Sequence, residues 1–199
     1  MNILHIDCSS RPASYSRRLS AAITAQLQDG PGPTTVIRRD LGLHPIPHTA
    51  TDYAESLSSP AAAGAASAGA HRLSEELITE LEAADIIVIG TPMHNFTIPS
   101  VLKAWIDQVL RVGRTIIPTS TGKVGALADR PVFVAIASGG VFEGEGANQP
   151  DLLTPYLTSA LGCIGLQSIR FTALQATAFK DETCLADEIL QSERVNWLA

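Results

Sequence analysis

The chain has no long hydrophobic run: its apolar stretches are only as long as a strand, so none is a candidate for a membrane span. The residues after Met1 lead directly into a strand-like run, without the charged and apolar segments of a secretory signal. The three cysteines, Cys8, Cys163 and Cys184, form no CxxC pair, which argues against a disulfide framework and against a thiolate metal site. We therefore expect a cytoplasmic protein with buried thiols and no membrane association.

Basic residues are few as well. Fourteen Lys and Arg stand against 20 Asp and Glu, which gives a formal net charge of -6. The sequence has no basic stripe that could displace counterions from a nucleic-acid backbone, so no nucleic-acid partner is expected and any phosphate ligand must be held locally. With 199 residues and 45% hydrophobic content, the chain can bury one core, and we expect a single domain over residues 1–199.

The sequence does contain a regular alternation of strand and helix patterns. Short apolar runs, several of them rich in β-branched residues, predict strands at 2–7, 34–39, 85–90, 131–137 and 168–173. Helical patterns are expected at 17–28, 72–84, 100–111, 151–162 and 181–197. The second strand is the least apolar and is expected near a sheet edge. This alternation predicts an α/β fold with a doubly wound, five-stranded parallel sheet in the order 2-1-3-4-5.

Three further segments carry weaker signals. Residues 55–71 are rich in Ala, Gly and Ser and are expected to form a mobile flap or a weak helix. Residues 115–130 are expected to form a loop or a hairpin. His44 and His48 stand four apart, but the prolines between them prevent the helix that would align two metal ligands, so no metal site is expected.

The loop after the first strand is rich in hydroxyls and has no glycine. A dinucleotide-binding fold would place G-x-G-x-x-G there, so a tightly bound NAD is not favoured. Four serines instead lead into the first helix: Ser9, Ser10, Ser14 and Ser16. The free N–H groups and the dipole at a helix start favour an anion such as phosphate. A plain N-cap is the alternative, but the position between the first strand and the first helix favours the phosphate.

The loop after the third strand carries two apolar side chains, Met93 and Phe96, and the amide of Asn95. Such a loop, at the carboxyl end of a buried strand, suits a flat aromatic ligand that also forms hydrogen bonds. Ser100 is expected to cap the helix that follows. A purely structural loop, whose Met and Phe fill the core, remains an alternative.

The fourth strand runs into Ser138, Gly139 and Gly140. Two glycines at this point allow backbone N–H groups to approach the edge of a ligand, although a simple β-turn would use the same residues. The sequence thus offers three candidate loops at the carboxyl ends of three strands.

The stretch PMHNFTIPSVLKAWIDQVLR, Pro92 to Arg111, resembles the signature of the FMN-dependent NADH-azoreductase (NADH:quinone oxidoreductase) family. The resemblance extends over essentially the whole chain and implies a flavodoxin-like fold with bound FMN. It implies phosphate contacts from Ser10, Ser14, Tyr15 and Ser16, with Ser9 as an alternative to Ser10. It implies flavin-ring contacts from Met93, His94, Asn95, Phe96, Ser138, Gly139 and Gly140.

The family resemblance also implies an activity. NADH or NADPH acts as a diffusible reductant, and a quinone or an aromatic azo compound is reduced by two electrons at the same site in a ping-pong reaction. No catalytic acid or base is required, because the cofactor carries the hydride chemistry. The family further implies a homodimer. Two other functions remain possible at this point, a non-enzymatic FMN electron carrier like flavodoxin and an NAD(P)H:flavin reductase.

Overall fold

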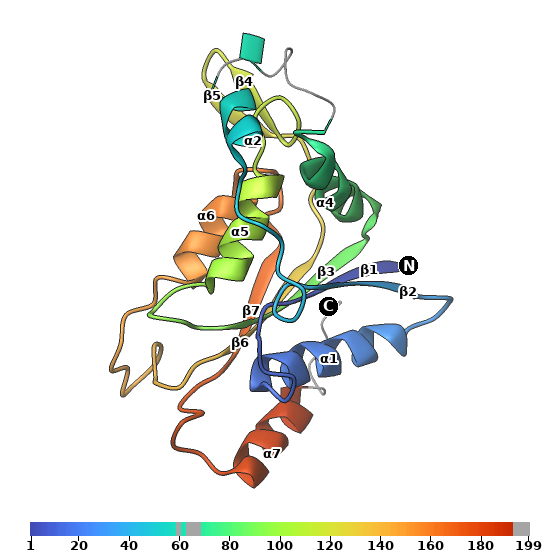
Figure 1. Cartoon of the computed structure of the whole chain (residues 1–199). Coiled ribbons are helices and arrows are strands. Elements are labelled where there is room, and N and C mark those ends of the chain that lie inside the picture. Colours follow the sequence, from blue (N-terminus) through green and yellow to red (C-terminus); the bar gives the residue numbers. More distant parts are fainter. Residues whose placement is uncertain (59–60, 63–68, 193–199) are drawn as a thin grey trace.

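Figure 1 shows the computed structural model of the chain, in which residues 1–58, 61–62 and 69–192 are described. At its centre is a five-stranded sheet in the order β2-β1-β3-β6-β7, with all neighbouring strands parallel. The strands are β1 (Asn2–Asp7), β2 (Thr35–Asp40), β3 (Ile86–Pro92), β6 (Val132–Ala137) and β7 (Ile169–Leu174). The predicted order is confirmed, and the weakly apolar β2 does lie at an edge.

Helices cover both faces of the sheet, as Figure 1 shows. One layer contains α1 (Tyr15–Gln28) and α7 (Glu182–Ser192). The other contains α4 (Arg72–Ala83), α5 (Ser100–Val109) and α6 (Thr154–Gly162). Successive residues of a strand point to opposite faces, and β3 is apolar at both sets of positions. Its Ile86 and Val88 therefore pack with the α1 side of the core, while Ile87 and Ile89 pack with the other side.

The remaining elements lie outside this sandwich. They are α2 (Thr51–Ser56) and the antiparallel hairpin of β4 (Ile116–Thr119) and β5 (Gly122–Gly125). Of the two possibilities for residues 115–130, a loop or a hairpin, the structure therefore has the hairpin. Within the described ranges, no helix has the length and the apolar character that a membrane span requires.

Several element ends differ from prediction. The helix predicted at 17–28 begins at Tyr15, two residues earlier, and the helix predicted at 100–111 ends at Val109. The prediction that Ser100 caps α5 is wrong: Pro99 is the N-cap, with φ -69° and ψ 154°, and Ser100 is the first helical residue. The proline ring itself fixes the φ of a cap position near -65°, so no serine is needed there.

The prediction of buried thiols holds for Cys8 alone. Cys163, at the C-cap of α6, and Cys184, on the outer side of α7, are exposed. The sequence pattern could not predict the exposure of these two thiols, because cysteine counts as a small apolar residue in such patterns whether it is buried or exposed. Part of the predicted flap at 55–71, namely residues 59–60 and 63–68, and the end of the last predicted helix, residues 193–199, lie outside the described residues.

Candidate functional site

The carboxyl ends of β1, β3 and β6 lie side by side at one edge of the sheet, and each continues into a loop. The Cys8 N–H donates to the Gly90 carbonyl at 2.8 Å, and the Met93 N–H donates to the Ala137 carbonyl at 2.9 Å. The chain leaves β1 for β2 on one side and later returns to β3 on the other, so the winding direction changes between β1 and β3. Open parallel sheets bind ligands at such a switch point. The three loops selected from the sequence therefore meet at one place.

Two buried serines stand at the start of α1. The hydroxyl oxygens of Ser14 and Ser16 lie 3.0 Å apart. Ser14 is the N-cap residue, but its side chain makes no capping hydrogen bond, so the plain N-cap does not describe this loop. No acidic residue lies in the first turn of α1. The paired hydroxyls and the uncompensated positive end of the helix are suited to an anion.

The other residues predicted to contact phosphate are arranged differently. The Tyr15 hydroxyl donates to Glu182 of α7 at 2.7 Å, which raises the pKa of Tyr15. Any contact of Tyr15 with a phosphate would therefore come from its backbone N–H. Ser10 is exposed, whereas the buried Ser9 accepts a hydrogen bond from the Arg11 N–H at 3.3 Å.

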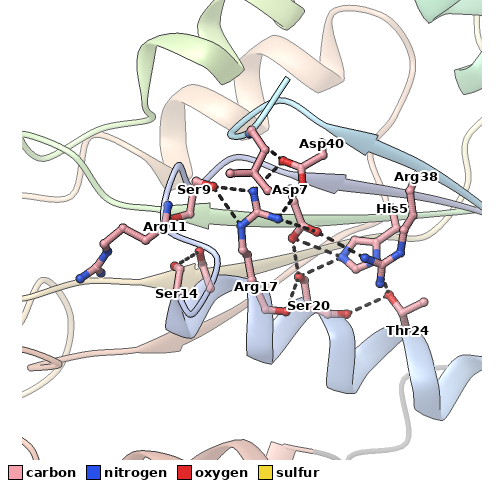
Figure 2. A network of polar contacts seen from close by, with 12 residues as sticks. His5, Asp7, Ser9, Arg11, Ser14, Arg17, Ser20, Thr24, Arg38 and Asp40 are labelled. Carbon is pink, nitrogen blue, oxygen red and sulfur yellow. Dashed lines mark hydrogen bonds and ion pairs between the residues drawn. The ribbon is translucent and has the colours of Figure 1, made fainter. Parts of the chain in front are cut away.

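A buried polar network lies directly beneath this loop, and Figure 2 shows it from close by. Arg17 donates to the Ser9 carbonyl from Nε at 2.9 Å and from a terminal nitrogen at 2.5 Å. Its two terminal nitrogens also hold the Asp40 carboxylate at 2.8 and 2.6 Å, and one lies 3.5 Å from Asp7. The hydrogen bond from Arg17 lowers the pKa of Asp40 and raises that of the guanidinium. Arg17 thus ties the loop to the ends of β1 and β2.

The network continues along α1 behind Asp7. Ser20 donates to the Asp7 carboxylate at 3.1 Å and lies 2.9 Å from His5 Nε2. Thr24 lies 3.4 Å from the other ring nitrogen, Nδ1 of His5. The side chains of His5, Asp7, Ser20 and Thr24 thus all have partners, as buried polar groups require.

The loop after β3 is exposed and has an unusual backbone. Asn95 and Phe96 adopt positive φ angles of 48° and 73°. Reciprocal backbone hydrogen bonds between His94 and Thr97, at 2.9 and 3.1 Å, close the turn around them. Phe96 is 45% exposed, which excludes the alternative that its ring fills the core, whereas Met93 packs against the core. Non-glycine residues held at positive φ cluster at ligand sites.

The loop after β6 is anchored from both sides. Ser138 is buried, its N–H donates to the Leu174 carbonyl at 2.9 Å, and its carbonyl accepts from the backbone and the hydroxyl of Thr177, both at 3.0 Å. Gly139 is exposed and Gly140 is partly exposed. The two glycines therefore present backbone at the surface while Ser138 fixes their position.

Gln149 is a residue of this site that sequence reasoning missed. Its side-chain nitrogen donates to the Ser138 hydroxyl at 2.7 Å and lies 3.4 Å from the Met93 sulfur. Its side-chain oxygen lies 2.8 Å from the position that a Cβ on Gly140 would occupy. Gln149 thus joins the loops after β3 and β6.

A pocket of about 490 Å³ adjoins the loop after β3. It lies between that loop, the first turn of α5 and Tyr156 of α6, and is lined by His94, Asn95, Thr97, Ile98, Pro99, Ser100, Lys103 and Tyr156. Its volume falls within the range of small-molecule sites. His94 and Asn95, two of the residues predicted to contact the flavin ring, therefore line this pocket.

The donors at the three loops fit a riboflavin phosphate. A phosphate monoester needs several hydrogen-bond donors and can be bound without a charged side chain. The first loop offers two buried hydroxyls beside the free N–H groups at the start of α1. A flavin ring needs an apolar face and polar groups along its edge. The exposed Phe96, the Asn95 amide and the backbone of Gly139 and Gly140 offer these groups.

Residues 1–197 match the model of a protein family that is described by its flavodoxin-like fold. Together with the parallel sheet and the site at its switch point, this match defines a flavodoxin-like α/β protein. The chain is 44% identical over 186 residues to FMN-dependent NADH:quinone oxidoreductase 4 of Pseudomonas fluorescens, covering 93% of this chain and 89% of that protein. It is 47% identical over 178 residues to FMN-dependent NADH:quinone oxidoreductase 2 of Cupriavidus pinatubonensis, covering 88% and 86%. The chain belongs to the family of FMN-dependent NADH:quinone oxidoreductases.

Solved structures agree with this fold. An azoreductase from Bacillus anthracis superimposes with a TM-score of 0.83 at 24% identity, covering 97% of each chain. At this identity the likeness establishes the architecture, which is the flavodoxin-like fold expected from the sequence.

Proposed function

We propose that this protein is an FMN-dependent oxidoreductase that takes two electrons from NADH or NADPH and passes them to quinones and aromatic azo compounds. The observation that carries the proposal is the meeting of the loops after β1, β3 and β6 at the switch point of the sheet. Membership of a family whose named members are FMN-dependent NADH:quinone oxidoreductases supports the cofactor, the reductant and the quinone acceptor. The azo acceptor rests on the signature in Pro92 to Arg111.

Each loop has a distinct part in holding the cofactor. The first loop would bind the phosphate through Ser10, Ser14, Tyr15 and Ser16. The loop after β3 would bind the ring through Met93, His94, Asn95 and Phe96, and the loop after β6 through Ser138, Gly139 and Gly140. When bound, FMN supplies the two-electron redox chemistry. The residues supply stacking, hydrogen bonds and exclusion of water, and no side chain is assigned a proton-transfer role.

The first experiment is the absorption spectrum of the purified protein. We expect a yellow protein that contains about one FMN per chain and loses its colour when NADH is added without air. A colourless preparation that takes up no FMN would overturn the proposal. The variant Asn95→Leu should retain less FMN than the wild type, and unchanged flavin content would count against the assignment of Asn95.

Steady-state kinetics separate this activity from the other two functions that the sequence left open. A ping-pong reaction gives parallel double-reciprocal lines when NADH is varied at several fixed quinone concentrations. An electron carrier would bind FMN but turn over negligibly with NADH. A flavin reductase would require free flavin as a second substrate, and its rate would depend on the concentration of added flavin.

The protein is further proposed to act as a homodimer. Apolar side chains are exposed on the β4–β5 hairpin and beside it: Ile117 is 43%, Val124 is 56% and Val112 is 51% exposed. Ile117 and Val124 are register partners in the hairpin, so they project from the same face. Sedimentation equilibrium is expected to give twice the mass of the chain, and a monomer would contradict this part of the proposal.

We place the protein in the cytoplasm. The three cysteines are free thiols, and Cys163 and Cys184 are exposed, which suits a reducing compartment. Cell fractionation, with the activity expected in the cytosolic fraction, tests the placement.

A further inference from the structure

The Ser9 carbonyl is held by two donors from one side chain. Arg17 approaches it with Nε at 2.9 Å and with a terminal nitrogen at 2.5 Å, from below the loop (Figure 2). The peptide bond between Ser9 and Ser10 is trans, because the described structure has no cis peptide bond. In a trans peptide the C=O and N–H bonds point in opposite directions. The Ser10 N–H must therefore point away from Arg17, out of the protein core.

This N–H has no acceptor within the described part of the chain. It lies in the hydroxyl-rich loop that leads to Ser14 and Ser16, where a phosphate is proposed to bind. A backbone N–H that is free, outward and fixed in direction is a good donor to a phosphate oxygen. The direction of this donor is set by Arg17, although Arg17 does not itself need to touch the phosphate.

The guanidinium is in turn held in place. Asp40, at the end of β2, binds both of its terminal nitrogens at 2.8 and 2.6 Å, and Asp7, at the end of β1, lies 3.5 Å away. The Arg17 side chain is only 12% exposed, and the carboxylates of Asp40 and Asp7 balance its charge within the protein. By contrast, Arg11 is exposed and points away from the network in Figure 2.

The space around this contact is fully occupied. A Cβ on Gly42 would stand 2.0 Å from the Ser9 oxygen and 2.9 Å from the Arg17 guanidinium. The chain after β2 thus packs directly against the Ser9 carbonyl, and the Gly42 N–H donates to the Asp7 carbonyl at 3.1 Å. The hydrogen bonds from Arg17 and the close packing of Gly42 therefore both favour the inward orientation of the Ser9 carbonyl.

We propose that Arg17 and Asp40 are positioning residues for the phosphate of FMN, because they hold the Ser9 carbonyl inward so that the Ser10 N–H faces the phosphate. This inference rests on the proposed function. It assigns to the pair no contact with the flavin ring. Loss of the pair should therefore weaken binding of FMN but not of riboflavin, which has the same ring and no phosphate.

The test compares flavin-free wild type with Arg17→Gln, Asp40→Asn and a matched control, Arg39→Gln. Arg39 also joins two elements by ion pairs, since it lies in β2 and binds Glu76, at 2.7 Å, and Glu80 of α4. Its side chain points to the face of the sheet opposite to that of its neighbour Asp40. Each protein is titrated with FMN and with riboflavin while quenching of flavin fluorescence is followed. Measurements at about 1 M salt, where the Debye length is about 3 Å, suppress long-range effects of the changed charges.

For Arg17→Gln we expect FMN to bind at least about tenfold more weakly, the effect of one lost hydrogen bond to a charged group. Riboflavin should bind within about twofold of the wild type. Asp40→Asn should show a smaller loss in the same direction, because Arg17 keeps its bond to Ser9 but loses its charged partner. Arg39→Gln should change neither affinity, even if it lowers the free energy of unfolding as much as Arg17→Gln does.

Three results would overturn the inference. Equal weakening of FMN and riboflavin would indicate a general structural role, and no weakening of either would remove the role altogether. Tighter FMN binding by Asp40→Asn would show that Arg17, once released, contacts the phosphate directly.

If Arg17→Gln does not fold, Arg17→Lys replaces it. Lysine can reach one acceptor but cannot bind Asp40 in bidentate fashion, so a loss confined to FMN is again expected. Wild type that binds no flavin would refute the proposed function itself, whereas a normal wild type with unselective variants refutes only this inference.

Discussion

The side-chain amide of Gln149 donates a hydrogen bond of 2.7 Å to the hydroxyl of Ser138 and lies 3.4 Å from the sulfur of Met93. An amide nitrogen carries two hydrogens, so it can serve both acceptors. One side chain thus fastens the loop after β3 to the loop after β6, and both loops are proposed to contact the flavin ring.

The variant Gln149→Ala removes this link at the ring end of the site. We expect FMN and riboflavin to bind about three- to tenfold more weakly and to the same extent, because the effect does not involve the phosphate. Titration with both flavins measures it. Weakening confined to FMN would contradict this role. The FMN-selective loss expected for Arg17→Gln would then no longer be specific to the phosphate end of the site.

Gly140 leaves the space that the Gln149 amide occupies. A Cβ at position 140 would lie 2.8 Å from the amide oxygen and 3.0 Å from the amide carbon of Gln149. Gly140→Ala should therefore displace this flexible side chain and weaken flavin binding about as much as Gln149→Ala does.

A double-mutant cycle tests that explanation. With Gln149 already truncated, Gly140→Ala has less to displace and should cost less, giving a coupling of about 0.5–1 kcal/mol between the two changes in flavin binding. Additive losses would show that the glycine acts by another route, such as backbone contact with the ligand.

Much of this arrangement could be predicted from local sequence. Buried strands show as short apolar runs, and the end of each parallel strand marks an edge of the sheet, so the loops at 9–16, 93–99 and 138–140 could be placed together. Asn95 was identifiable by its residue type in such a loop. Its positive φ angle agrees with the tolerance of asparagine for that conformation.

Arg17 and Gln149 could not be assigned in this way, because their partners are remote in sequence. Asp40 lies 23 residues from Arg17, and Met93 lies 56 residues from Gln149. A signal for Arg17 does exist. Asp7 and Asp40 end two neighbouring strands and are register partners, and two carboxylates placed side by side at a buried edge require a cation. The arginine in the first turn of the next helix is well placed to supply it. Gln149 has no comparable signal, since it sits in an irregular loop.

Asp129 links the chain before β6 to the chain before β7 and should make stability depend on pH. Its carboxylate accepts hydrogen bonds from the backbone of Gln167 and Ser168 at 2.7 and 3.0 Å and from the Ser168 hydroxyl at 2.7 Å. These bonds, above all that from the Ser168 hydroxyl, lower the pKa of Asp129 to about 2, from a usual value of 3.8. Because the folded-state pKa is the lower one, the contribution to stability is complete above pH 4 or so and is lost as the pH falls towards about 2.

Asp129→Asn should therefore lower the free energy of unfolding at neutral pH, by about 1 kcal/mol since the site is exposed. The difference from the wild type should shrink as the pH falls from about 4 to about 2. Urea denaturation at a series of pH values measures it. A difference that stays constant over that interval would mean that the negative charge of Asp129 does not contribute to the free energy of unfolding.

Phe96 combines an exposed aromatic ring with a backbone conformation that favours glycine. Its φ angle is 73°, its side chain is 45% exposed, and its carbonyl is anchored by the Leu152 N–H at 3.0 Å. A residue with a Cβ in this region carries about 1–2 kcal/mol of backbone strain. Such strain is typical of functional sites, and contact of the Phe96 ring with the flavin would account for it here.

Replacement by two small residues separates the backbone from the ring. Phe96→Gly removes both the strain and the ring, whereas Phe96→Ala removes the ring but keeps the Cβ. We expect the glycine variant to be more stable than the alanine variant by about 1 kcal/mol in thermal or urea unfolding of the flavin-free protein. Both should bind FMN and riboflavin more weakly than the wild type, because both lack the aromatic face. If the alanine variant is the more stable by about 0.4–1 kcal/mol, which is the unfolded-state effect of alanine without strain, the strain is absent. If both variants bind flavin as the wild type does, the ring of Phe96 has no part in the site.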